Sequence, residues 1–334
     1  MSAAEPVFHG GDLAAATAQF GKPAAGWIDL STGINPMPWP VDGAAAVESL
    51  ARLPDSDALR DLEAAARAAY CAGPGVAAVA APGTQALIQW LPHLFAPCRV
   101  AVVSPTYGEH APAWRAAGHD VAAVPCLPAA EAADIVVLAR PNNPDGRTAD
   151  AAALDVLGRD LAAKGGLLVV DEAFADVTED PTTAAPDRLA LRSFGKFYGL
   201  PGLRLGFALC GADLADRLHA ALGPWAVSSP AIDIGIGALS DRAWQAATRR
   251  RLVADAARLD ALICGAGLAV VGGTTLFRLA AGEGATSLFD RLGRAGIYVR
   301  RFPENPRWLR FGLPGGEAAW ARLERALAAS GPAS

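Results

Sequence analysis

The chain has 334 residues, of which 52% are hydrophobic and 19% charged, and its formal net charge is −5. This composition is typical of an enzyme with one large core and a smaller second domain, and it argues against a disordered or fibrous protein. Lys and Arg are scattered without a basic run, which excludes nucleic acid as the expected partner.

No apolar stretch approaches the roughly 20 residues that a membrane-spanning helix needs, and the first residues lack the pattern of a secretory signal. We therefore expect a soluble, cytoplasmic protein. The five cysteines are odd in number and widely spaced, which favours reduced thiols used as small core residues over a disulfide framework. They are Cys71, Cys98, Cys126, Cys210 and Cys264. No metal site is expected, because the carboxyl-terminal end has no Cys or His cluster.

Strands and helices are expected to alternate along the chain. After a polar amino-terminal arm, the pattern predicts a helix over 44–70, a strand over Val76–Ala80 and an apolar-faced helix over Thr84–Phe95. Four later runs lack polar alternation, which is typical of strands covered on both faces. They are Arg99–Val103, Ile135–Leu138, Leu167–Val170 and Arg188–Leu191. A mostly parallel central sheet follows from this pattern.

From about Ala226 the pattern changes. We expect a long charged helix over 241–266, strands near Val270, Leu276 and Tyr298, and a closing helix over 318–329. The expected organisation is an arm with part of a small domain over 1–43, a large domain over 44–225 and the rest of the small domain over 226–334.

One lysine stands in a segment suited to covalent catalysis. Residues 193–206 read SFGKFYGLPGLRLG, so Lys196 has a hydroxyl at Ser193 and a guanidinium at Arg204. A lysine in an enclosed site can attack a carbonyl and form an imine. The carbonyl expected here is that of pyridoxal 5'-phosphate (PLP).

Two further motifs could serve such a site, although each has a simpler interpretation. Gly83-Thr84-Gln85 lies at an expected helix start, where backbone N–H groups can bind a phosphate; alone, it would be read as a tight turn with a cap. Asp171 follows an apolar strand, where it could keep a pyridine nitrogen protonated; the alternative is a helix cap. The sequence 140–146, RPNNPDG, is a turn by its chemistry.

The lysine segment resembles that of fold type I aminotransferases, most closely the branch that contains histidinol-phosphate aminotransferases and threonine-phosphate decarboxylases. The resemblance spans nearly the whole chain. It implies an α/β fold: a large domain with a mostly parallel seven-stranded sheet between helices, plus a smaller α+β domain. It also implies PLP as the cofactor and a homodimer.

The resemblance also implies a role for each matching residue on the cofactor side. The phosphate would be held by Gly83, Thr84, Gln85, Ser193 and Arg204, and the pyridine nitrogen by Asp171. Tyr107 would stack on the ring, Asn143 would donate to the phenolic oxygen with Asn142 as a mere neighbour, and Lys196 would carry the imine.

On the substrate side, Arg310 would bind the substrate carboxylate and Arg300 the substrate's own phosphate, with Arg301 left in solvent. The arm residues His9, Gly10, Gly33 and Asn35 resemble those that close over the substrate, and Asn143 would contribute from the cofactor side. Two anionic anchors imply a phosphorylated amino acid.

Two positions depart from the pattern of the branch. Phe174 stands where most relatives have a tyrosine that donates to the phenolic oxygen, so that bond is absent here. Leu53 replaces a tyrosine that reaches the phosphate in the neighbouring subunit. The first departure favours a decarboxylase, and the second questions the cross-subunit contact.

The leading hypothesis is decarboxylation of L-threonine O-3-phosphate to (R)-1-amino-2-propanol O-2-phosphate in cobalamin biosynthesis. The alternative is an aminotransferase acting on histidinol phosphate or a related amino acid. A PLP-binding regulator is less expected, because the chain has no basic helix-turn-helix segment before the arm.

Overall fold

The structure is a computed structural model that describes residues 10–328. It divides into two compact units. The smaller unit comprises the chain up to Met37, Pro144–Gly146 and the chain from Ala247, and the larger unit comprises Pro38–Asn143 and Arg147–Ala246. The expected boundaries lay at 43/44 and 225/226; α8 (Ser229–Ser240), expected in the small domain, packs on α3 (Ser56–Ala69) in the larger unit.

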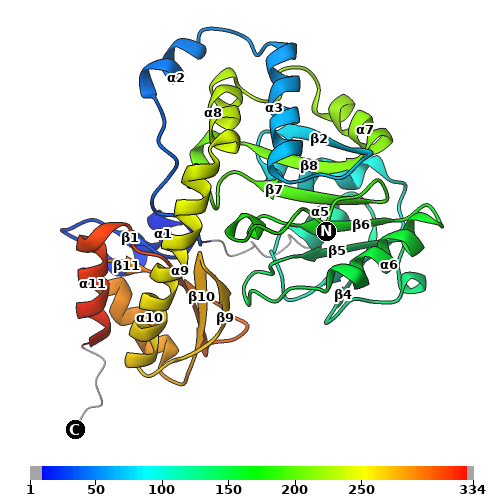
Figure 1. Cartoon of the computed structure of the whole chain (residues 1–334). Coiled ribbons are helices and arrows are strands. Elements are labelled where there is room, and N and C mark those ends of the chain that lie inside the picture. Colours follow the sequence, from blue (N-terminus) through cyan, green and yellow to red (C-terminus); the bar gives the residue numbers. More distant parts are fainter. Residues whose placement is uncertain (1–9, 329–334) are drawn as a thin grey trace. The chain divides into compact units, whose positions relative to one another are not determined.

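The larger unit is built on a seven-stranded sheet with the order β2-β8-β7-β6-β5-β3-β4 (Figure 1). Only β8 runs antiparallel to its neighbours, so the expected mostly parallel sheet is confirmed. The strands are β2 (Val76–Ala81), β3 (Arg99–Val103), β4 (Asp120–Val124), β5 (Ile135–Ala139), β6 (Leu167–Asp171), β7 (Arg188–Ser193) and β8 (Gly206–Gly211).

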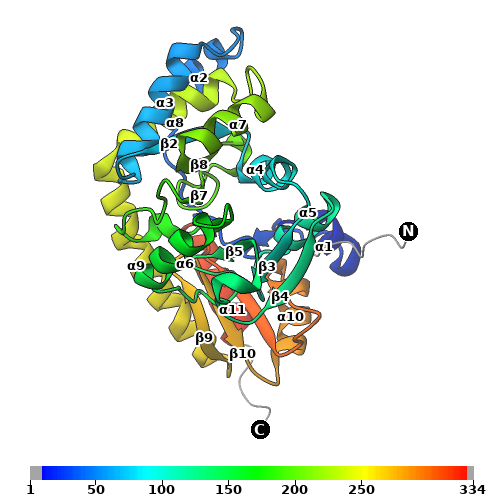
Figure 2. The same ribbon diagram turned by 90° about the vertical axis from the view of Figure 1, so that its right-hand side faces the viewer.

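Helices cover both faces of this sheet (Figure 2). Val100, Val137 and Val169 pack in one core with α4 (Thr84–Trp90), α5 (His110–Ala116) and α7 (Ala212–Leu222). The residues that alternate with them, such as Val136 and Val170, pack in a second core with α6 (Ala151–Ala162). Because successive strand residues point to opposite faces, strands buried on both sides are apolar throughout.

The predicted helix over 44–70 is wrong in one respect, since the chain forms α2 (Gly43–Ser49) and α3 with a break between them. Pro54 lies in the break, and proline disfavours helix at the residue before it. Asp55 then caps α3 by accepting from the N–H groups of Asp57 (2.7 Å) and Ala58 (3.3 Å). The helix predicted over Thr84–Phe95 likewise ends at Trp90 and continues as η1, a 3-10 turn over Leu91–Leu94.

The smaller unit contains a parallel pair, β1-β11, and a four-stranded sheet with the order β12-β13-β10-β9. Its strands are β1 (Ile28–Asp29), β9 (Ala269–Thr274), β10 (Phe277–Ala281), β11 (Ile297–Tyr298), β12 (Arg300–Arg301) and β13 (Trp308–Gly312). Its helices are α1 (Leu13–Phe20), α10 (Ala285–Arg294), α11 (Gly316–Ala328) and most of α9 (Arg242–Gly265). The predicted long helix and closing helix are thus present.

The structure also bears on the expectations for the cysteines and for a membrane-spanning helix. Cys210 is buried and the half-buried Cys98 packs against the same core, as expected, whereas Cys71, Cys126 and Cys264 are exposed and are not core residues. Across residues 10–328, no helix combines the length and apolar character needed to cross a membrane.

Candidate active site

Groups that could bind an anion come together where α4 begins. Gly83 has a φ of +84°, and a Cβ there would lie 2.5 Å from Nη2 of Arg204. A Cβ on Gly206 would lie 2.5 Å from the backbone nitrogen of Thr84. Ser193 pairs with Gly206 across β7 and β8. Both glycines are therefore required for the close approach of a hydroxyl, a guanidinium and the helix start.

Arg204 is held in place by its own turn. It follows the 3-10 turn η4 (Pro201–Leu203) in a left-handed conformation, with φ +53°, and its Nη1 donates to the carbonyl of Pro201 at 3.0 Å. This leaves Nη2, the atom nearest Gly83, directed at the start of α4.

Lys196 lies in a segment with fixed aromatic neighbours. Phe194 and Tyr198 are fully buried and stack with centroids 4.2 Å apart, and Tyr198 stacks in turn on Trp244 at 5.9 Å. The Lys196 amine lies 5.3 Å from the ring centroid of Phe174. Packing therefore restricts the backbone on both sides of the lysine, which limits the positions its amine can reach.

Asp171 is the last residue of β6 and is 6% exposed. Its Oδ2 is 2.9 Å from Nε2 of His110, and its Oδ1 accepts from the N–H of Ala173 at 3.0 Å. An ionised carboxylate can only accept, so Nε2 of His110 carries the proton in this pair. The sequence analysis did not single out His110; its only signal was its place three residues after Tyr107, at the start of α5.

Tyr107 and Gln85 form a unit. The Tyr107 hydroxyl donates to Oε1 of Gln85 at 3.1 Å, and Nε2 of Gln85 donates to Glu109 at 3.3 Å. The Tyr107 ring also meets His110 edge-on at 5.8 Å. The Gln85 side chain thus holds Tyr107. The group of Gln85 that could still bind a phosphate is its backbone N–H.

The two asparagines of the 140–146 turn have different surroundings. Asn142 is buried, and its Nδ2 donates to the carbonyl of Pro105 at 2.9 Å. Its backbone N–H donates to the carbonyl of Arg147 at 2.8 Å. Asn142 therefore stabilises the turn, while Asn143 is half-buried.

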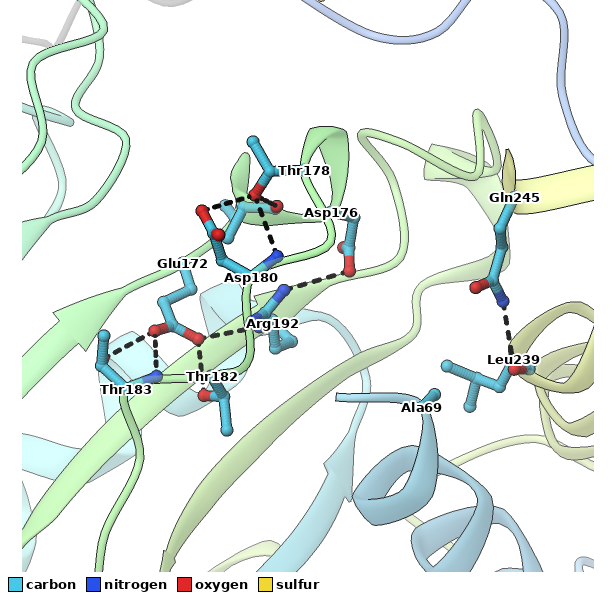
Figure 3. A network of polar contacts seen from close by, with 12 residues as sticks. Ala69, Glu172, Asp176, Thr178, Asp180, Thr182, Thr183, Arg192, Leu239 and Gln245 are labelled. Carbon is cyan, nitrogen blue, oxygen red and sulfur yellow. Dashed lines mark hydrogen bonds and ion pairs between the residues drawn. The ribbon is translucent and has the colours of Figure 1, made fainter. Parts of the chain in front are cut away.

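Behind Asp171 and Ser193 lies a buried ionic network (Figure 3). Glu172 accepts from Nε of Arg192 at 2.8 Å, and from Thr182 and Thr183. Nη1 of Arg192 donates to Asp176 at 3.1 Å. Arg192 on β7 thus binds Glu172 and Asp176, which flank Phe174 in the loop after β6. The network therefore joins that loop to β7.

In the smaller unit, Arg310 is fully buried beside a second cation. It pairs with Arg300 across β12 and β13, its Nη2 donates to the carbonyl of Ser31 at 2.5 Å, and its guanidinium lies over Phe277. Burial, together with the charge of Arg300, lowers the pKa of Arg310 to about 9, and the charge of Asp29 opposes this shift. Such a cation gains most from an anionic ligand.

The arm residues contact Ser31, the residue whose carbonyl accepts from Arg310. A Cβ on Gly10 would lie 2.3 Å from the carbonyl oxygen of Ser31, and the N–H of Gly11 donates to Oγ of Ser31 at 2.7 Å. Gly33 has a φ of +65°, and Asn35 is buried. Ser31, which sequence analysis missed, therefore joins the arm to Arg310. His9 lies outside the described residues.

The predicted residues fall into two groups, one in each unit. The larger unit brings together Gly83, Thr84, Ser193 and Arg204, and separately Gln85, Tyr107 and Asp171 through His110. The smaller unit brings together Gly10, Arg300 and Arg310 around Ser31. Leu53 is 69% exposed, in the break between α2 and α3.

The residues of the larger unit fit the implied PLP. Because Gly83 has no side chain, the Arg204 guanidinium lies directly against the start of α4. A guanidinium beside backbone N–H groups is suited to bind a phosphate monoester. A buried carboxylate held by a histidine suits a protonated ring nitrogen.

Several known proteins resemble the chain over almost its full length. The model of the family described as "Aminotransferase class I and II" matches residues 26–329. The chain is 43% identical to the threonine-phosphate decarboxylase of Pseudomonas aeruginosa, over 96% of this chain and 96% of that protein. It is 41% identical to the threonine-phosphate decarboxylase of a Sinorhizobium species, over 97% and 98%. A solved structure of histidinol-phosphate aminotransferase from Sinorhizobium meliloti with pyridoxal-5'-phosphate shares the fold, with a TM-score of 0.78, 22% identity and coverage of 98% and 95%.

Proposed function

The chain belongs to the aminotransferase class I and II family, and we propose that it is a PLP-dependent decarboxylase of L-threonine O-3-phosphate. The product would be (R)-1-amino-2-propanol O-2-phosphate, a precursor in cobalamin biosynthesis. The observation that carries this proposal is the 43% and 41% identity, over almost the full length, to two proteins named threonine-phosphate decarboxylase. The buried donor set of the larger unit supports the same cofactor.

Bound PLP supplies an electron sink for the pair left on the α-carbon when carbon dioxide departs. The protein's part is to hold and orient. Asp171, fixed by His110, keeps a positive charge on the ring nitrogen favourable, and Ser193 with Arg204 anchors the phosphate. The amine of Lys196 would return a proton to the α-carbon.

The substrate would be held through its two anions. Arg310 offers a planar fork to the carboxylate, and Arg300, beside it on β12, suits the phosphate. By fixing the carboxylate, these arginines would favour carbon dioxide release over loss of the α-hydrogen, which would lead to transamination.

We also propose a cytoplasmic homodimer. Val47, Leu50 and Leu53 are all about two-thirds exposed, and Trp225 is 60% exposed. The Ser229 hydroxyl, four residues after Trp225, donates to the carbonyl of Arg52 at 2.9 Å, which supports one shared apolar surface. A second copy of the chain would remove this surface from water. With leucine at position 53, no hydroxyl from this position can reach a partner's phosphate.

The test is one incubation of purified, PLP-loaded protein with L-threonine O-3-phosphate. Carbon dioxide and, with 2-oxoglutarate present, keto-acid exchange are followed in parallel. Carbon dioxide without exchange is expected; exchange without carbon dioxide would make the protein an aminotransferase. Two variants separate the sites. Lys196→Ala should remove the visible absorbance of lysine-bound PLP, and Arg310→Ala should keep that absorbance while weakening substrate binding.

A further inference from the structure

The side-chain amide of Gln85 has its orientation set by Glu109. Its Nε2 donates to Oε2 of Glu109 at 3.3 Å, and its Oε1 accepts from the hydroxyl of Tyr107 at 3.1 Å. An ionised carboxylate can only accept, so the oxygen end of the amide cannot face Glu109. Glu109 therefore presents the oxygen of Gln85 to Tyr107, and the Tyr107 hydroxyl must donate to it.

Gln85 connects the start of α4 with the segment that leads into α5. It is the second residue of α4, directly after Thr84, and it is half-buried. Tyr107 lies 22 residues further along the chain, and Glu109 lies 24 residues further. The backbone N–H of Gln85 is one of the groups that could bind the PLP phosphate, whereas its side chain fixes Tyr107. One residue thus relates the place of the phosphate to the place of the stacking ring.

The contacts of Tyr107 also favour a positive charge above its ring. Hydrogen bonds in a chain polarise one another, and this chain ends on the carboxylate of Glu109. Donation by the hydroxyl raises the electron density of the phenol ring, and the face of an aromatic ring attracts a cation. The pyridine ring that Asp171 would keep protonated carries such a charge. His110, which holds Asp171, meets the Tyr107 ring edge-on at 5.8 Å.

We propose that Glu109 and Gln85 are positioning residues that fix the ring of Tyr107 over the pyridine ring of PLP and so strengthen cofactor binding. This inference rests on the proposed function for the stacking of Tyr107 on PLP. Glu109 acts on Gln85, and Gln85 acts on Tyr107, so removal of the Tyr107 hydroxyl should cancel the effect of the other two.

A double-mutant cycle between Gln85 and Tyr107 tests this order. Gln85→Met keeps the backbone N–H and a good helix former but loses the amide, and Tyr107→Phe keeps the ring but loses the hydroxyl. Each should weaken PLP binding about 3- to 10-fold in fluorescence titration, as expected for one hydrogen bond. The double variant should bind PLP no more weakly than the weaker single variant; if the two losses multiply, the proposal is overturned. Gln89→Met, at an exposed position of the same helix, is the matched control and should bind PLP as the wild type does.

Substitutions at Glu109 separate positioning from long-range charge. Glu109→Gln retains an oxygen that can accept from Gln85 and should bind PLP within about twofold of wild type. Glu109→Lys offers a donor instead, which favours the turned amide with its NH2 towards Tyr107, and it should weaken PLP binding about 3- to 10-fold. An added positive charge that acted only on the anionic phosphate would strengthen binding instead. Tighter PLP binding by Glu109→Lys would therefore refute the proposal.

The visible circular dichroism of lysine-bound PLP reports the surroundings of the ring at saturating cofactor. Gln85→Met and Glu109→Lys should alter this signal, because the Tyr107 ring is no longer fixed, while Gln89→Met should leave it unchanged. Wild-type spectra in both positioning variants would overturn the inference, even if the variants were less stable.

One further variant separates the inference from the proposed function. Tyr107→Ala should bind PLP more weakly than Tyr107→Phe does, and wild-type affinity in Tyr107→Ala would overturn the stacking role together with the inference. All of these measurements are made without substrate. A wild-type protein that binds PLP but releases no carbon dioxide would therefore refute the proposed reaction alone.

Discussion

The buried ion pairs of Arg192 give a direct test of how β6 and β7 are held together. Its Nε lies 2.8 Å from Glu172 and its Nη1 lies 3.1 Å from Asp176, and all three residues are at most 5% exposed. Burial lowers the pKa of Arg192, but the charges of Glu172 and Asp176 outweigh it and hold that pKa above its ordinary value. The guanidinium is therefore charged wherever the protein is folded.

Arg192→Met keeps much of the side-chain volume but leaves Glu172 and Asp176 buried without their counter-ion. Removing one partner of a buried pair costs about 3–5 kcal/mol. Because two carboxylates lose the same partner, we expect the free energy of unfolding to fall by about 4–5 kcal/mol. Urea unfolding of the cofactor-free protein, followed by circular dichroism, measures this change.

The double variant Arg192→Met/Glu172→Gln is the control, since it removes one of the two uncompensated charges. The amide that Glu172→Gln introduces would still accept from one threonine, so the double variant should be more stable than Arg192→Met alone. The reasoning fails if Arg192→Met costs less than about 1 kcal/mol, or if the two substitutions simply add.

Three further predictions concern single side chains. Gly83→Ala should weaken PLP binding at least 10-fold in fluorescence titration, since its Cβ would lie 2.5 Å from a guanidinium nitrogen, while Gly202→Ala, which meets no atom within 4 Å, should bind normally. The hydrogen bond to Glu63 raises the pKa of His219, so the stability from this pair is complete below about pH 6.5 and is lost as pH rises through the raised value. His219→Asn should remove this pH dependence of stability, which is worth less than about 1 kcal/mol because the histidine is 41% exposed. An unchanged pH dependence in thermal unfolding would contradict this prediction. Phe174→Tyr should lower the pH midpoint of the visible absorbance of lysine-bound PLP by about 1–2 units, because a hydrogen bond to a charged oxygen is worth about 1.5–3 kcal/mol. An unshifted midpoint would mean that the new hydroxyl does not reach the phenolic oxygen of PLP.

The sequence predicted β2, β3, β5, β6 and β7 from continuous apolar runs, which are typical of strands buried on both faces. It missed β8, although that central strand is also buried. It did not predict β4, an edge strand that pairs only with β3 and has two residues half-buried and three exposed. Such a strand has no continuous apolar run. The break between α2 and α3 was missed because the residues on both sides favour helix, and Pro54 alone marks the interruption.

The candidate site was predictable where a local motif carries the chemistry, as with Lys196 and Asp171. His110, Ser31 and Glu109 were missed because their partners lie far away in sequence. His110 and Asp171 are 61 residues apart, and Glu109 and Gln85 are 24 apart. No spacing rule connects such residues, so only the folded backbone reveals that each one orients a predicted residue.

The register of β6 and β7 explains why the motif residues occur in pairs. Asp171 lies opposite Leu191, so Ser193, two residues on, points to the same face as Asp171, and the intervening Arg192 points to the other. Glu172 follows Asp171 and meets Arg192 on that other face. One face thus carries the carboxylate and hydroxyl predicted to hold PLP, while the opposite face carries the ion pair that joins the strands. Because adjacent residues serve opposite faces, substitution of Glu172 or Arg192 should change the spacing of Asp171 and Ser193 without touching either, and weaker PLP binding by Arg192→Met would detect this coupling.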